Sequence, residues 1–414
     1  MRQLLSLICS FFISLLLVPL IRKVSAGSDA FARQNKRTIH HGKISRIGGI
    51  AIYAAFAISM SLFIEPDRAL IGAFLASSMM FFTGLADDFF DLKPGMKMLF
   101  QFLAACLLIQ YGVRTDSLHL PFGIVIDWPI LSALFTLVWV VGITNAVNLM
   151  DGLDGLAGGI SLVVFSIVAS ISLVDHRMDM ITLSMVMCGA LLGFLIYNAH
   201  PASIFMGDCG SLFLGCMIAS TSLMGFKSST ILTLALPILI LLLPIIDTLS
   251  AILRRKIKGQ SFSTADKKHL HHQLMRRFGH GNTVVIMCGI TFLFGLCAFL
   301  YIYDRKFGLL LILILLVIIE VFIEKTGMIS PYYRPLLGFL NRIIGGSERP
   351  NQKRSANRQT NQKHSSKTTM DESMEFTIRM SVSNPGRSKL ASQEIEQTRR
   401  IKFGNREHHR SNHR

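Results

Sequence analysis

The chain has 414 residues, of which 51% are hydrophobic and only 16% are charged. Soluble domains of ordinary composition are about 25% charged, so this composition argues against a chain of soluble domains and favours membrane spans. Lys and Arg outnumber Asp and Glu by 42 to 25, which gives a formal net charge of +17. The seven cysteines form no CxxC pair, which argues against a disulfide framework or a zinc site.

Apolar stretches close to the roughly 20 residues that a helix needs to cross a bilayer recur along the first 325 residues. There are eleven of them: 3–21, 47–65, 69–86, 97–112, 129–147, 156–174, 180–198, 211–226, 230–252, 283–302 and 308–324. We therefore predict an all-α, polytopic integral membrane protein with about 11 transmembrane helices. The first stretch has a long apolar core followed at once by Arg22-Lys23, so we interpret it as a retained helix rather than a signal peptide.

The positive charges predict the orientation. The odd-numbered connections between the stretches carry 17 Lys and Arg residues, and the even-numbered ones carry six. Cytoplasmic loops carry the excess of positive charge, so the N-terminus is predicted outside and the C-terminus in the cytoplasm.

The C-terminal part has a different composition. Residues 325–414 hold 18 Lys and Arg against 7 Asp and Glu, so most of the net charge lies there rather than on one basic surface, and a nucleic-acid partner is not expected. The predicted domains are a membrane domain at 1–325, a juxtamembrane segment at 326–345 and a disordered basic tail at 346–414. The tail's charge could hold it near anionic lipid headgroups.

Chemically unusual polar residues gather in the odd-numbered loops. The third span runs into Asp87-Asp88, with Asp91 close behind. Adjacent acids at a membrane boundary repel one another unless a cation lies between them, and Mg²⁺ prefers one or two carboxylates together with substrate phosphates. The alternative interpretation is a solvated helix cap.

The fifth span ends in a polar segment in which Asn145, Asn148, Asp151 and Asp154 recur every three residues. In a helix this spacing would place all four near one stripe. Gly152 would let the backbone turn or let a ligand approach closely. A structural turn rich in Asp-Gly is the alternative.

The loop after the seventh span contains Asn198, then Phe205-Met206-Gly207-Asp208 at the start of the next helix. Asp208 could act as an N-cap, and helix N-termini also bind phosphate. A later basic loop carries His269, His271 and His272, which could bind a transition metal but beside phosphates more plausibly donate hydrogen bonds or act as acid–base groups. A solvated basic loop remains the alternative.

Acids, cations and histidines on one membrane face together indicate a diphosphate substrate and a divalent metal. In the first loop, Arg37 and His40 suit an anionic headgroup or nucleotide, although the positive-inside rule alone would also explain cations there. The substrate-binding candidates are Asn145, Asn148, Gly152, Asn198, Phe205, Arg37, His40 and Lys97.

The ordered motifs resemble those of the polyprenyl-phosphate N-acetylhexosamine-1-phosphate transferases. They are Asp87 to Asp91, Asn145 to Ala157, Phe205 to Ser211, Pro244 to Asp247 and His269 to His272. The resemblance implies a helical bundle with a cytoplasmic cleft. It also implies transfer of a sugar 1-phosphate from a UDP-N-acetylhexosamine to undecaprenyl phosphate in the bacterial inner membrane, with release of UMP.

The resemblance also assigns roles. It implies a metal ligand at Asp208, with Asp87 and Asp88 as a catalytic and metal-binding pair, and Mg²⁺ as the ion, or Mn²⁺ in its place. The further candidate catalytic residues are Asp151, Asp154, His269, His271 and His272. A homodimer is left open.

Two features indicate the branch that uses N-acetylglucosamine for cell-surface polysaccharides. The sequence His-Leu-His-His at 269–272 replaces the three consecutive histidines of the muropeptide branch, and Asp91 replaces its lysine. The first loop departs from the family, with Ser45 where a Pro is usual and Arg37-Thr38 in place of Arg-Lys. The alternatives are a phospho-N-acetylmuramoyl-pentapeptide transferase, an enzyme like the CDP-alcohol phosphotransferases, a prenyl synthase or a transporter.

Overall fold

The computed structural model describes residues 1–26, 44–114, 118–119, 125–126, 128–225 and 270–326, together with the single residues 245, 336 and 338. The chain divides into two compact units, Met1–Gly338 and Phe339–Arg414, and every described residue belongs to the first. The predicted tail therefore lies outside the described residues, as does almost all of the juxtamembrane segment.

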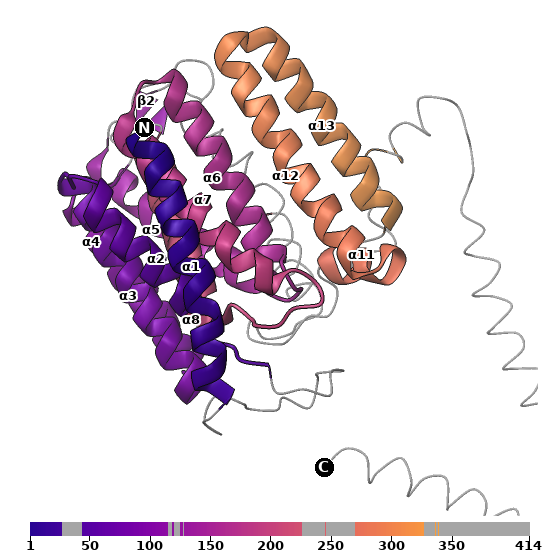
Figure 1. Ribbon diagram of the computed structural model, residues 1–414. Helices are drawn as coiled ribbons and strands as arrows, with labels where there is room; N and C mark the ends of the chain where they lie inside the picture. The colour runs from indigo at the N-terminus through magenta and orange to yellow at the C-terminus, as the bar shows by residue number, and fades with distance from the viewer. Residues whose placement is uncertain are drawn as a thin grey trace, which may run out of the picture. The chain divides into compact units, whose positions relative to one another are not determined.

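The regular structure of the described part is helical apart from one pair of short strands (Figure 1). The helices are α1 (Arg2–Ala26), α2 (Gly49–Phe63), α3 (Arg68–Phe90), α4 (Pro94–Gln110), α5 (Pro129–Met150), α6 (Leu156–Val174), α7 (Met178–Asn198), α8 (Gly207–Gly225), α11 (Leu270–Phe278), α12 (His280–Tyr303) and α13 (Arg305–Thr326). The strands β1 (Leu118–His119) and β2 (Val125–Ile126) pair antiparallel, with Leu118 opposite Ile126.

Six of the described helices are long and apolar enough to cross a membrane: α1, α3, α5, α6, α7 and α12. The helices α2 and α4 are shorter and apolar. These helices confirm the predicted helical, polytopic membrane protein, whereas the count of eleven spans and the orientation stay predictions. The predicted span 230–252 lies outside the described residues except for Ile245, and each of the other ten overlaps a helix.

Helix α8 forms the centre of the bundle, packing against α2, α3, α5 and α6. Every residue of α8 from Cys209 to Met224 is buried. On the other side, α7 packs along α1, where Gly189 and Gly193 of α7 face the α1 backbone near Leu7 and Phe11. Because lipid is as apolar as the side chains, such helices associate through close packing, and small residues let their backbones approach.

Two close backbone approaches fix the start of α8. Gly84 of α3 lies against the backbone of Asp208 and Cys209, and Gly49 of α2 lies against Gly210. A Cβ atom at either glycine would overlap main-chain atoms of α8. These contacts bring the C-terminal end of α3, which carries the paired acids, up to the N-terminal end of α8.

Candidate active site

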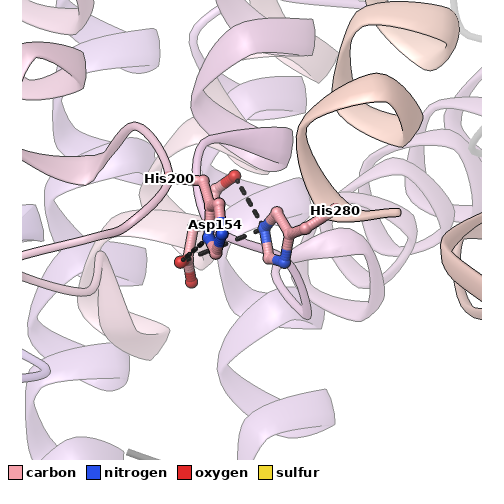
Figure 2. A group of neighbouring side chains, drawn as sticks. All are labelled: Asp154, His200 and His280. Carbon is pink, nitrogen blue, oxygen red and sulfur yellow. Dashed lines mark hydrogen bonds and ion pairs between the residues drawn. The ribbon is translucent and has the colours of Figure 1, made fainter. Parts of the chain in front are cut away.

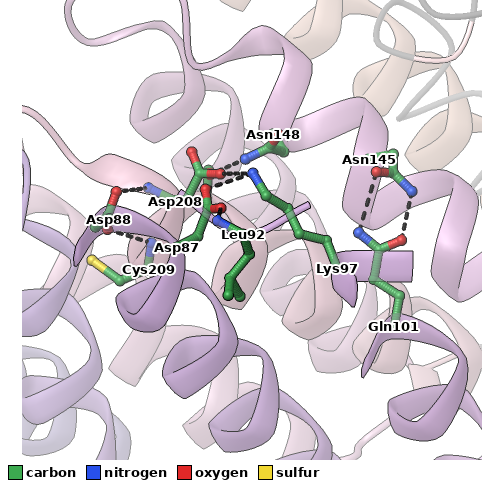
Figure 3. Close-up of polar contacts among 10 residues, drawn as sticks. Asp87, Asp88, Leu92, Lys97, Gln101, Asn145, Asn148, Asp208 and Cys209 are labelled. Carbon is green, nitrogen blue, oxygen red and sulfur yellow. Dashed lines mark hydrogen bonds and ion pairs between the residues drawn. The ribbon is translucent and has the colours of Figure 1, made fainter. Parts of the chain in front are cut away.

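Two carboxylates from separate helices meet one lysine at the start of α8 (Figure 3). Lys97 of α4 places its Nζ 2.5 Å from Asp87 Oδ2 and 2.7 Å from Asp208 Oδ2. The second carboxylate oxygen of Asp87, Oδ1, accepts a hydrogen bond from the backbone N–H of Leu92 at 2.8 Å. The structure thus brings together three of the predicted site residues, which lie on α3, α4 and α8.

Asp88 has a different role from its neighbour. Its Oδ1 and Oδ2 accept hydrogen bonds from the backbone N–H groups of Asp208 and Cys209, each at 2.9 Å. These donors are among the first N–H groups of α8, which have no partner within the helix. Asp208 is therefore not the cap of its own helix, because the carboxylate of Asp88 caps it from α3.

Side-chain amides lie near the acidic cluster, which consists of Asp87, Asp88 and Asp208. Asn148 Nδ2 donates to Ser211 Oγ at 2.8 Å, one turn along α8 from Asp208. Asn145 and Gln101 form a reciprocal amide pair, with distances of 2.7 and 3.2 Å, and Asn145 also donates to the carbonyl of Val141. The amide of Asn145 therefore joins α5 to α4, which differs from the direct substrate contact predicted for it.

The polar segment after α5 is a turn. Helix α5 ends at Met150 and α6 begins at Leu156, and Gly155 between them has a φ of 77° that favours glycine. The expected stripe of four residues is therefore wrong, because Asp151 and Asp154 lie beyond the helix that holds the two asparagines. The Asp-Gly turn alternative describes this part of the segment correctly.

The carboxyl of Asp151 lies among other acids. Burial and, after it, the negative charges of Asp208, Asp88 and Asp154 raise the pKa of Asp151 to about 7, although Arg46 acts in the opposite direction. Among the described residues, the site thus gathers more carboxylates than the cations beside them can neutralise. Gly152, which was predicted to contact substrate, is exposed in the same turn.

The loop after α7 is held from both sides. The buried amide of Asn198 accepts from the N–H of Gly155 at 3.0 Å and donates to the carbonyl of Ile204 at 2.8 Å. Phe205 pairs through its backbone with Ser45 and Gly48, at 2.8 and 2.9 Å. Asn198 therefore positions this loop through the backbone, whereas a substrate contact was predicted, and the Phe205 side chain is half-buried.

A second polar cluster lies at the same turn. Asp154 Oδ2 is 2.9 Å from His200 Nδ1, and the ring of His200 stacks on that of His280 with centroids 4.1 Å apart (Figure 2). Neither histidine was predicted as a site residue. His200 follows Asn198 by two residues in the sequence, but only its spatial neighbours distinguish it from an ordinary loop histidine.

Some predicted residues cannot be placed. Arg37, His40 and His269 lie outside the described residues, and only the backbones of His271 and His272, in α11, are described. Gln101 was not predicted, although its spacing of four from Lys97 in α4 puts the two on one helix face.

The acidic cluster has the donor set for a hard divalent cation. Carboxylate oxygens of Asp87 and Asp208 already converge on one cation, the Lys97 ammonium, from different helices. Mg²⁺ takes oxygen ligands, usually one or two carboxylates completed by water and substrate phosphates. The residues present therefore fit such an ion.

Comparison with known proteins points to one family. The family model described as Glycosyl transferase family 4 matches residues 70–226. A probable undecaprenyl-phosphate N-acetylglucosaminyl 1-phosphate transferase of Bacillus subtilis is 35% identical over 83% of this chain and 98% of its own length. A decaprenyl-phosphate N-acetylglucosaminephosphotransferase of Mycolicibacterium smegmatis is 35% identical over 64% of this chain and 73% of its own. A phospho-N-acetylmuramoyl-pentapeptide-transferase of Listeria welshimeri is 31% identical over 63% of this chain and 84% of its own length.

Proposed function

The chain belongs to glycosyl transferase family 4, and we propose that it transfers N-acetylglucosamine 1-phosphate, or a related N-acetylhexosamine 1-phosphate, from the UDP-sugar to undecaprenyl phosphate, with release of UMP. One observation carries the proposal: carboxylates of Asp87 and Asp208 converge on a single cation at the start of α8, inside the segment that the family model matches. The product would feed synthesis of a cell-surface polysaccharide.

The reaction needs positioning and charge stabilisation more than a strong base. An oxygen of the lipid phosphate, largely ionised at neutral pH, attacks the phosphorus that bears the sugar, and the bond to the UMP oxygen breaks. Holding the two phosphates in line and stabilising the charge that develops supply most of the rate enhancement in such a transfer. The bond made and the bond broken are both pyrophosphate bonds, so the reaction is nearly balanced.

We assign a different part of this reaction to each residue of the site. Asp208 and Asp87 would hold Mg²⁺, which would supply charge neutralisation at the diphosphate. With a metal bound by Asp87 and Asp208, the ammonium of Lys97 would be available for a phosphate oxygen. Asp88 was predicted to be a catalytic residue and a metal ligand, but both of its oxygens bind the α8 backbone, so we assign it the positioning of Asp208.

The polar residues define which end of the bundle faces the nucleotide. Asp151 of the turn lies within electrostatic reach of Asp88 and Asp208, and Asn198 ties the loop after α7 to that turn. The sequence predicts the excess of Lys and Arg in the odd-numbered connections on the same face. We therefore place the site on the cytoplasmic face of a bacterial inner membrane, in a bundle of about eleven spans with the N-terminus outside. A homodimer remains a proposal without a described interface.

The runner-up is transfer of a muropeptide phosphate, which the Listeria welshimeri relative's name describes for that protein. The sequence His-Leu-His-His and the acid at Asp91 favour the N-acetylglucosamine branch. A membrane assay with undecaprenyl phosphate, Mg²⁺ and a panel of UDP-sugars separates the two. Lipid-linked product from UDP-N-acetylglucosamine supports the proposal, and product from the UDP-muropeptide alone contradicts it.

The metal assignment has its own test. The Asp208→Asn variant should fold, keep its thermal stability within a few degrees and release no UMP, because it loses a charged ligand but keeps the shape of the side chain. Full activity in this variant would contradict the assigned metal role.

A further inference from the structure

Asp154, His200 and His280 bring three metal-binding side chains to one point outside the acidic cluster (Figure 2). They come from three separate parts of the chain: the turn after α5, the loop after α7 and the first residue of α12. Their ligand atoms, a carboxylate oxygen and two ring nitrogens, all lie within 4.8 Å of one another. Sequence proximity therefore does not explain the grouping.

The distances match what a small ion requires. Ligands about 2.0–2.1 Å from a tetrahedral Zn²⁺ lie about 3.3 Å from one another. Asp154 Oδ2 is 2.9 Å from His200 Nδ1 and 4.0 Å from His280 Nε2, so the two distances bracket that value. The rings of His200 and His280 are stacked, and His280 Nε2 lies 3.3 Å from the carbonyl oxygen of Asp154, so one ring would turn out of the stack to direct both nitrogens at one ion.

A backbone donor holds the carboxylate in place. The N–H of Ala202 donates to Asp154 Oδ2 at 3.2 Å. Side-chain exposures of 12% for Asp154 and 19% for His280 compare with 40% for His200, so the ligands are largely buried while one of them is open to solvent. An ion could therefore enter past His200.

We propose that Asp154, His200 and His280 form a site for a borderline transition-metal ion such as Zn²⁺, separate from the Mg²⁺ site assigned to Asp87 and Asp208. Two imidazoles and one carboxylate suit Zn²⁺ and its neighbours, whereas Mg²⁺ prefers oxygen ligands. Three protein ligands also leave a fourth position for water or an anion, as in open zinc sites.

A metal here would act on the architecture of the candidate active site. His280 begins α12 and follows α11, which contains His271 and His272. Coordination would tie the start of α12 to the turn after α5 and to the loop after α7. The segment that carries the predicted histidines would thereby be fixed beside the acidic cluster.

The test uses Co²⁺ as a spectroscopic probe on the full-length chain, purified in detergent with an affinity tag that contains no histidine. The four tail histidines and three others that could bind metal on their own are first replaced by alanine: His364, His408, His409, His413, His269, His271 and His272. Titration should then give visible d–d bands with one Co²⁺ bound per chain at this site, in the presence of excess Mg²⁺. Zn²⁺ should displace the Co²⁺ and abolish the bands.

Variants locate the site. His200→Ala and His280→Gln should each weaken Co²⁺ binding at least tenfold and remove the bands. His176→Asn, at the opposite end of α6, should leave both unchanged. His280→Gln keeps a hydrogen-bonding side chain, so it serves as the second variant if His200→Ala does not fold. Absence of d–d bands in the parent, or bands that persist in both variants, would overturn the proposal and leave a hydrogen-bonded cluster.

Discussion

Removing the lysine between the two carboxylates should strengthen Mg²⁺ binding. Lys97 Nζ lies 2.5 and 2.7 Å from oxygens of Asp87 and Asp208, and these are the oxygens assigned to the metal. A Mg²⁺ ion must therefore displace the ammonium before it can bind. In the Lys97→Met variant this competition is absent, whereas the two carboxylates remain.

The strength of the two contacts of Lys97 determines how much tighter Mg²⁺ should bind in the variant. A hydrogen bond between charged groups contributes about 1.5–3 kcal/mol when buried. The Lys97 side chain is 24% exposed, so solvent screening reduces each contact to about 0.5–1 kcal/mol. Two contacts give about 1–2 kcal/mol, which corresponds to Mg²⁺ binding roughly 5–30-fold tighter in the variant.

Isothermal titration of Mg²⁺ into the detergent-solubilised protein measures this difference. Lys93→Met is the matched control, because it removes the same charge from an exposed position just before α4. Because salt screens the charge of an exposed lysine, the Mg²⁺ affinity of the control should change by less than about twofold. Equal or weaker Mg²⁺ binding in Lys97→Met, compared with the control, would refute the shared cation position.

Three further changes test the framework around the site. Asp88→Asn should lower the apparent Tm by destabilising the chain by about 1–3 kcal/mol, because an amide cannot accept from both N–H groups of α8, and an unchanged Tm would contradict the capping role. Gly84→Ala should lower the free energy of unfolding by about 1–3 kcal/mol, because the new Cβ would push α3 away from α8. Gly142→Ala is the control: no atom lies within 4 Å of its new Cβ, so the free energy of unfolding should stay the same or rise. Thermal unfolding of Gln101→Leu, Asn145→Leu and the double variant should give a coupling energy of about 1 kcal/mol, and simple additivity would show that the amide pair contributes nothing.

The helices were largely predictable from the sequence because a long apolar run in lipid can satisfy its backbone only as a helix. Ten of the eleven predicted spans overlap a described helix, with ends that differ by a few residues. The end of α5 was harder to predict. A spacing of three among Asn145, Asn148, Asp151 and Asp154 looks helical, but Gly155 adopts a positive φ and the helix ends first.

The separate roles of Asp87 and Asp88 show what the sequence could and could not predict. The sequence predicted a shared metal-binding role for the two, although neighbouring residues on a helix point about 100° apart. Which carboxylate meets Lys97 and which caps α8 depends on how α3, α4 and α8 pack, and no local pattern encodes that. His200 and His280 likewise meet only through the packing of α12 on α6.

The fate of one phosphorus atom tests the central claim most directly. UDP-N-acetylglucosamine labelled with ³²P in the phosphate that bears the sugar is incubated with the purified protein, undecaprenyl phosphate and Mg²⁺. Transfer of a sugar 1-phosphate predicts label in the lipid fraction and release of unlabelled UMP in equal amount. Label that stays in water-soluble UDP, with only the sugar reaching the lipid, would contradict the account.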